Sequence, residues 1–270
     1  MSLAGGVLVA RLTRTVLILL CVGAAAPGWA QTERVVDIPT RPGVTQRILV
    51  LGPEKPTAAV ILFAGGDGGL RLTPQGDISW GKGNFLVRTR ALFAQQRLLV
   101  AVIDAPSDRQ LPPYLSGFRQ TREHAADVRA VIAWLKKEAA VPVWLVGTSR
   151  GTQSAGSIAT SLPPAEGGPD GIVLTSTILT DPRGRPVPDM PVDRIKVPVL
   201  VVHHKLDGCA LCRYADIDAL MGRLTATPRR ELLTFDGGTS KGDPCEAFAH
   251  HGYAGIERDV VAKIGAWVVR

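Results

Sequence analysis

Short apolar segments alternate along the chain with longer segments whose apolar residues recur at helical spacing. Eight of the apolar segments have the length and β-branched content of buried strands: residues 34–38, 46–51, 58–64, 98–103, 142–146, 171–176, 197–203 and 231–235. Most stretches between them are long enough for a crossover helix, which is typical of parallel strands. The pattern therefore predicts an α/β fold with a mostly parallel sheet of about eight strands, flanked by helices.

The intervening segments predict helices at residues 84–96, 119–139, 152–162, 214–224 and 256–269. On the long helix at 119–139, Ala126, Ala130, Ala133 and Trp134 are expected on the packing side, with His124 facing solvent. The Pro-rich connection at residues 180–194 has no helical period and is too short for a large lid domain. Nothing interrupts the alternation, so residues 31–270 are expected to form one catalytic domain.

Residues 1–30 have the composition of a signal peptide rather than of a folded segment. Arg11 and Arg14 precede an apolar run of about a dozen residues, and small residues flank Trp29 at the end of the segment. The pattern predicts cleavage after Ala30 and export to the periplasm or the medium. An uncleaved anchor is the alternative, but the run is shorter than the roughly 20 residues that span a bilayer.

The charges suit a soluble exported protein without a nucleic-acid site. The chain has 31 Lys and Arg against 24 Asp and Glu, a formal net charge of +7, and losing Arg11 and Arg14 lowers it to about +5. The basic residues are scattered and form no dense run. We therefore expect no nucleic-acid partner and no stable membrane insertion after cleavage, while the oligomeric state stays open.

Beyond the signal peptide, three cysteines remain, at positions 209, 212 and 245. An oxidising compartment predicts one disulfide and one spare thiol. A Cys209–Cys245 bond is favoured, because both residues follow late strands at the same sheet edge; Cys212–Cys245 and the short Cys209–Cys212 ring remain open. The C-x-x-C of Cys209 and Cys212 also permits a redox or metal site, although the expected thioredoxin-like context is missing.

One motif carries a specific chemistry. Gly147-Thr148-Ser149-Arg150-Gly151 is a G-x-S-x-G sequence that lies between a buried strand and a helix, where a tight turn lifts the serine above the sheet. In that setting Ser149 is the candidate nucleophile. A glycine-rich turn with a helix-capping serine is the structural alternative.

A serine nucleophile needs a base and an acid, which in such a sheet follow in the order Ser, Asp or Glu, His. Asp207 follows the strand at 197–203 and is the candidate acid. His250 and His251 both lie between the last strand and the last helix; His251, followed by Gly-Tyr, is favoured as the base, with His250 as the alternative.

The loop after the third strand supplies candidates for an oxyanion hole, which needs two backbone N–H groups. Its Gly-Gly-Asp-Gly-Gly sequence makes Gly66 the first candidate and Asp67 the second, while Arg150, after the nucleophile, supplies the other N–H. The side chains of Arg150, Arg88 and Arg109 are candidates for binding a substrate carboxylate, against the alternative that Arg150 pairs with a nearby Asp.

Four segments together resemble the α/β-hydrolase superfamily, in particular exported bacterial members related to dienelactone hydrolases and small esterases. They are AGGDGG, GTSRG, LDGC and CEAFAHHGY, and the blocks GNFLVRTR and DAPSDRQ add to the likeness. The resemblance implies ester hydrolysis through an acyl-enzyme, with Ser149, Asp207 and His251 as the triad and with no metal or organic cofactor. The chain departs from dienelactone hydrolases in having serine for their cysteine, and Ala64 stands where lipases have histidine.

The sequence thus predicts a serine hydrolase that cleaves carboxylic esters of small or medium-sized molecules. Two alternatives remain: a peptidase or amidase of the same fold, and a non-catalytic exported binding module.

Overall fold

The computed structural model describes residues 1–3, 5, 33–182 and 184–270, and residues 31–270 form one compact unit. Nearly all of the predicted signal peptide lies outside the described residues. Among the described helices, none has the length and apolar character that a membrane span requires.

An eight-stranded sheet organises the unit, in the order β1-β2-β4-β3-β5-β6-β7-β8. β1 and β2 form an antiparallel hairpin, and β2 pairs antiparallel with β4; all later pairs are parallel. The bounds are β1 Arg34–Arg41, β2 Val44–Leu51, β3 Ala58–Phe63, β4 Leu98–Ile103, β5 Val143–Thr148, β6 Gly171–Thr175, β7 Val199–His204 and β8 Arg230–Phe235. The predicted fold class is confirmed.

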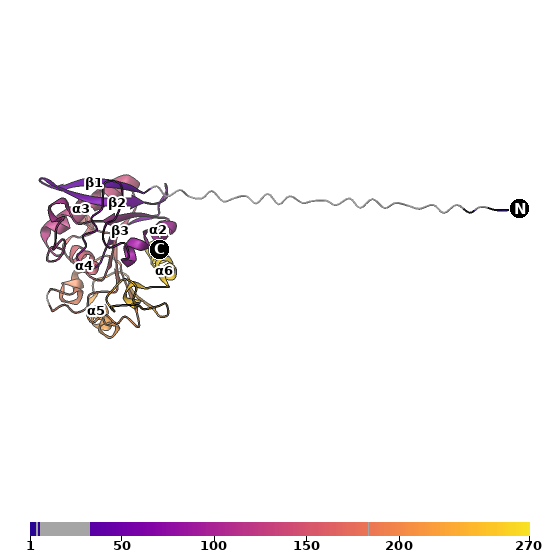
Figure 1. The fold of residues 1–270 in the computed structure, drawn as a ribbon. Helices are drawn as coiled ribbons and strands as arrows, with labels where there is room; N and C mark the ends of the chain where they lie inside the picture. Colours follow the sequence, from indigo (N-terminus) through magenta and orange to yellow (C-terminus); the bar gives the residue numbers. More distant parts are fainter. Residues whose placement is uncertain (4, 6–32, 183) are drawn as a thin grey trace. The chain divides into compact units, whose positions relative to one another are not determined.

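Helices cover both faces of this sheet (Figure 1). They are α1 Phe85–Arg88, α2 Arg90–Gln95, α3 Arg122–Ala139, α4 Gly151–Ser161, α5 Ile217–Arg223 and α6 Glu257–Val268. On β3, Ile61 and Phe63 belong to an apolar cluster that includes residues of α3, α4 and α5, whereas Val60 and Leu62 belong to a second cluster with residues of α1, α2 and α6. Successive strand residues point to opposite faces, so a parallel strand with no polar positions is buried on both sides.

Two predicted helices differ in their bounds. The helix expected at 84–96 divides into α1 and α2 at Thr89, whose hydroxyl donates to the Phe85 carbonyl at 2.6 Å. The helix expected from Arg119 begins at Arg122, because Thr121 caps it by accepting a hydrogen bond from the His124 N–H.

The predicted packing side of α3 is right only in part: Ala130 and Trp134 are half-buried against the core, as expected, but other residues form the fully buried face. Val128, Val131, Ile132 and Leu135 face the core, and Ala133 is exposed. The large aliphatic side chains bury more apolar area than the alanines do, so they set the orientation of the helix. His124, expected in solvent, is also buried, with Nε2 3.0 Å from Ser154 Oγ on α4. Burial lowers the pKa of His124 to about 3, so the ring is neutral at ordinary pH.

The connection from β6 to β7 contains two short 3₁₀ turns, Val187–Asp189 and Val192–Arg194, and no large lid. Within residues 33–182 and 184–270, no inserted domain covers the carboxyl ends of the parallel strands.

Steric contact at the start of α4 yields a test of this fold. A Cβ on Gly151 would lie 2.1 Å from the Phe63 carbonyl oxygen, so Gly151→Ala must displace β3 from α4. We expect a loss of about 2 kcal/mol or more in the free energy of unfolding, measured by urea denaturation. Gly222→Ala on α5 is the control: a Cβ there meets no atom within 4 Å, so stability should stay equal or rise by up to about 1 kcal/mol. Equal stability of both variants would contradict the close packing.

Candidate active site

Ser149 occupies the sharp turn between β5 and α4. Its φ is +52°, in the left-handed region that non-glycine residues seldom adopt, at a cost of about 1–3 kcal/mol. Three hydrogen bonds hold this conformation: the Ser149 N–H donates to Thr175 O, and Ser149 O accepts from the N–H and the hydroxyl of Thr152. Strain maintained by its surroundings is a common property of functional sites.

The turn is possible because its neighbours lack side chains. A Cβ on Gly147 would lie 2.4 Å from the Gly151 carbonyl oxygen, and one on Gly65 would lie 3.1 Å from Ser149 Cβ. The glycines of the motif thus let α4 start directly against β5. Gly65 brings the loop of residues 64–69, here called the glycine loop, into contact with Ser149.

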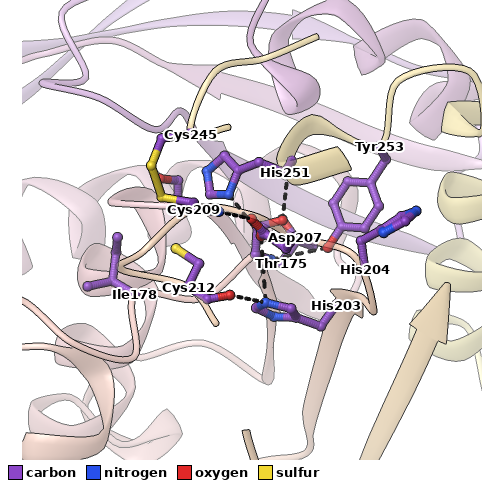
Figure 2. Close-up of polar contacts among 12 residues, drawn as sticks. Thr175, Ile178, His203, His204, Asp207, Cys209, Cys212, Cys245, His251 and Tyr253 are labelled. Atoms are coloured by element: carbon purple, nitrogen blue, oxygen red, sulfur yellow. Dashed lines mark hydrogen bonds and ion pairs between the residues drawn. A yellow bond between two sulfur atoms is a disulfide. The ribbon is translucent and has the colours of Figure 1, made fainter. Parts of the chain in front are cut away.

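Asp207 and His251 come from two different loops at the carboxyl edge of the sheet. Asp207 follows β7, and His251 lies in a 3₁₀ turn before α6. His251 Nδ1 is 2.9 Å from Asp207 Oδ2, and both side chains are buried (Figure 2). Asp207 Oδ1 accepts from the Cys209 N–H at 2.9 Å, so the carboxylate is fixed through both oxygens. A carboxylate in this position holds one tautomer and one orientation of the imidazole ring.

The two neighbouring histidines have different surroundings. His250 stacks on His204 with ring centroids 4.3 Å apart. His251 lines a pocket together with Ser149, and its buried Nε2 has no hydrogen-bond partner within residues 33–182 and 184–270. A resting enzyme often lacks the nucleophile–base hydrogen bond that forms with substrate. The geometry therefore favours His251 over His250 as the partner of Ser149.

The Ser149 pocket has a volume of about 500 Å³. Its polar side brings Gly66, Asp67 and Arg150 together with Ser149 and His251. Its apolar side includes Trp80, Ile178, Leu211 and Phe248. A small or medium-sized molecule with a polar reacting group and an apolar substituent fits a pocket of this kind.

The backbone of this pocket can bind a developing negative charge. The N–H groups of Gly66, Asp67 and Arg150 donate to no other group in the described part of the chain. Arg150 directly precedes α4, whose N-terminal end carries a partial positive charge. Free N–H groups beside a nucleophile are the requirement for an oxyanion hole.

The three candidate arginine side chains have protein partners. Arg150 Nη1 is 2.8 Å from Asp181 Oδ2, the pairing that the sequence left open, although Arg150 still lines the pocket. Arg88 donates to the Gly83 and Gly252 carbonyls and pairs with Glu257, and Arg109 lies over the Phe118 ring. Neither Arg88 nor Arg109 lines the Ser149 pocket, although Arg88 lies behind its wall, where it binds the lining residues Gly83 and Gly252.

Several polar residues around the site make supporting contacts whose partners the sequence did not assign. His203 Nε2 is 2.7 Å from Cys212 O and 3.6 Å from Asp207 Oδ2, and burial lowers the pKa of this histidine. The Tyr253 hydroxyl donates to Val202 O and accepts from the Ser176 N–H. The Ser176 hydroxyl donates to His251 O at 2.7 Å, which joins β6 to the histidine loop. Such partners depend on tertiary contacts, and only the Gly-Tyr after His251 gives a local signal.

A disulfide joins Cys209 to Cys245. It connects the loop of Asp207 with the loop of His251, and both cysteines line the Ser149 pocket. Figure 2 shows the bond beside the Asp207–His251 pair. The disulfide limits relative motion of the two loops that must keep this pair in register.

Cys212 is a free, fully buried thiol. Cys209, Cys212 and His251 place potential ligand atoms within 4.8 Å of one another. However, Cys209 Sγ belongs to the disulfide, and burial raises the pKa of the Cys212 thiol. A thiolate is the form that binds metals and attacks disulfides. The C-x-x-C motif is therefore suited neither to metal binding nor to disulfide exchange.

Solved structures resemble this one over most of the chain. No protein-family model and no curated protein sequence matches this chain. The Pyrococcus furiosus esterase Pf2001 aligns with a TM-score of 0.63 and 13% identity, covering 89% of this chain and 93% of that one. A dienelactone hydrolase from Anabaena variabilis aligns with a TM-score of 0.58 and 17% identity, covering 88% of this chain and 96% of that one. An α/β serine hydrolase without a lid from Xanthomonas campestris aligns with a TM-score of 0.53 and 14% identity, covering 87% of this chain and 94% of that one.

These similarities, with the strand order and the turn at Ser149, define the architecture. The chain has the α/β-hydrolase fold, as the sequence resemblance implied. Identities this low establish the fold and leave the reaction to be argued from the site.

The disulfide provides a test of how the site is held together. Cys245→Ser should lower the free energy of unfolding by about 4 kcal/mol, because the bond closes a loop of 36 residues. Urea denaturation of oxidised protein measures this, and non-reducing peptide mapping should find a Cys209–Cys245 peptide. Cys212→Ala is the control and should keep that linked peptide. A Cys209–Cys212 peptide, or three free thiols, would contradict the pairing.

Proposed function

We propose that the protein is an exported serine hydrolase that cleaves carboxylic esters of small or medium-sized molecules through an acyl-enzyme. The observation that carries the proposal is that Ser149, at a strained turn, lines one pocket with His251, whose Nδ1 is bound to the buried Asp207. A hydroxyl at the start of a helix, a histidine with a free Nε2 and a buried carboxylate on Nδ1 are the parts of a Ser-His-Asp triad.

In the proposed reaction, His251 Nε2 removes the proton from Ser149 Oγ as the oxygen attacks the ester carbonyl. The Arg150 N–H and the N–H of Gly66, or that of Asp67, bind the resulting oxyanion. His251 then protonates the leaving alcohol, and a water molecule activated by the same nitrogen hydrolyses the acyl-enzyme. Asp207 stabilises the imidazolium that forms in each half-reaction.

The volume and the lining of the pocket favour a compact substrate. The pocket volume of about 500 Å³ holds a small or medium-sized ester, and no large lid covers it. Trp80 and Phe248 are about half exposed at its apolar side, where they suit an acyl chain or alcohol group of modest length. Esterases, and a hydrolase without a lid, are among the proteins with similar structures. The Cys209–Cys245 bond favours an oxidising compartment, in keeping with the proposed export.

Assays of matched ester and anilide substrates, run side by side, measure whether the protein prefers ester or amide bonds. We expect p-nitrophenyl esters of short to medium acyl length to be hydrolysed faster than the matching p-nitroanilides, because p-nitrophenolate is a far better leaving group than the p-nitroanilide nitrogen. A preference for anilides would instead favour the peptidase or amidase alternative.

Ser149→Ala should lower ester hydrolysis at least about a thousandfold, because the nucleophile is lost while the fold is kept. The variant should also lose labelling by a fluorophosphonate probe. Ser161→Ala, at an exposed position further along α4, is the matched control and should keep wild-type activity and labelling. Activity of Ser149→Ala above a few per cent of wild type would refute the assignment of the nucleophile.

His251→Ala should lose activity to the same degree as Ser149→Ala, since among the described histidines it is His251 that lines the pocket with Ser149. His250→Ala should stay within about tenfold of wild type, because it removes only a ring stacked on His204. Thermal unfolding of both variants checks that they are folded. If His250→Ala is the inactive variant and His251→Ala the active one, the base is His250.

A further inference from the structure

Arg119 is a buried cation whose hydrogen bonds all go to neutral oxygens. It lies before α3 and is only 4% exposed. Nη1 donates to Ser154 Oγ at 3.0 Å, and Nη2 donates to the carbonyls of Ala64 at 3.0 Å and Gly66 at 3.2 Å. Burial is the main cause that lowers the pKa of Arg119, to about 9, so the group remains charged at neutral pH. Keeping a cation here is costly compared with an apolar side chain of similar size.

Two of these bonds hold the glycine loop at the point where its N–H groups matter. The carbonyls of Ala64 and Gly66 belong to the peptide units on either side of the Gly65–Gly66 peptide. Fixing both flanking units fixes the direction of the Gly66 N–H between them. The Asp67 N–H, the other candidate donor, shares its peptide unit with the bound Gly66 carbonyl. Arg119 therefore constrains whichever of these two donors faces the oxyanion.

The loop depends on such a contact because its own sequence gives it little rigidity. Gly66 and Gly68 have positive φ values of 59° and 79°, and glycine backbone loses more conformational entropy on ordering than any other. A Cβ on Gly68 would lie 2.5 Å from Arg119 Nη2, so the loop leaves room for the guanidinium group. Two further bonds fix the far side of the loop: the Leu115 N–H donates to Asp67 O, and the Gly69 N–H donates to Asp67 Oδ1.

The third bond connects the same guanidinium group to the helix of the nucleophile. Ser154 lies on α4, which begins two residues after Ser149, and its hydroxyl also contacts His124 Nε2. Arg119 thus ties the glycine loop to α4 through one rigid, planar group. The two elements whose N–H groups would form the oxyanion hole are held at a fixed separation.

We propose that Arg119 is a positioning residue that holds the oxyanion-hole loop in register with Ser149. This inference rests on the proposed ester hydrolysis. It assigns Arg119 no contact with the substrate: the residue acts through the N–H groups of the glycine loop. The effect should therefore appear in the transition state, where the oxyanion exists, and not in binding of the uncharged ester.

The test compares Arg119→Met and Arg119→Lys with wild type. The concentration of competent Ser149 is first titrated with a fluorophosphonate, so that misfolded protein does not enter kcat. Misplacing a catalytic group by about 1 Å costs on the order of a hundredfold, so we expect kcat per titrated site to fall about 30- to 100-fold in Arg119→Met. KM should change less than about threefold. The Ki of phenylboronic acid, which forms a tetrahedral adduct with an active serine, should rise in parallel with the loss in kcat/KM.

Arg119→Lys keeps the charge but not the planar donors. Its kcat per titrated site should lie between that of Arg119→Met and that of wild type. Arg129→Met, which removes an exposed arginine of α3, is the control and should match wild type. A kcat per titrated site within threefold of wild type in Arg119→Met would overturn the inference, as would a rise in KM alone. If Arg119→Met does not fold, full wild-type kcat in Arg119→Lys overturns it. A wild-type protein that neither reacts with the probe nor cleaves esters refutes the proposed function itself, and with it this inference.

Discussion

The site depends on one steric constraint: β5 must end and α4 must begin within a turn that forces Ser149 to a positive φ. That turn exists only because Gly147 and Gly151 allow backbone contacts that any side chain would block. It places the Ser149 hydroxyl at the carboxyl edge of the sheet and directs the N-terminal end of α4 at the same point. The glycine loop, the Asp207 loop and the His251 loop then reach that point from β3, β7 and β8.

Long-range contacts align these loops, since no secondary structure connects them directly. The disulfide and the Asp207–His251 bond join the acid and base loops, and Ser176 anchors the histidine loop to β6. Arg119 connects the glycine loop to α4. Each catalytic group is thus fixed by a partner from a different part of the chain. This is the preorganisation that transition-state stabilisation requires.

The sequence predicts much of this because parallel strands buried on both faces appear as apolar runs, and β4 was predicted at the bounds the structure gives it. The order of Ser149, Asp207 and His251 relative to the strands also follows from the chain. The break at Thr89, the buried face of α3 and the environments of His124 and Arg119 could not be predicted. They depend on which tertiary partner a polar side chain meets: Ser154 binds both His124 and Arg119, yet it is distant from each in sequence.

The central claim, that Ser149 forms an acyl-enzyme, is tested most directly by trapping the intermediate. Protein mixed with p-nitrophenyl acetate is quenched in acid during the pre-steady-state phase, and its peptides are mapped by mass spectrometry. We predict one acetyl group, on the peptide that contains Ser149 and at that residue, appearing together with a burst of p-nitrophenol. Ester turnover with an unmodified Ser149, or with an acetyl group on another residue, would contradict this account of the protein.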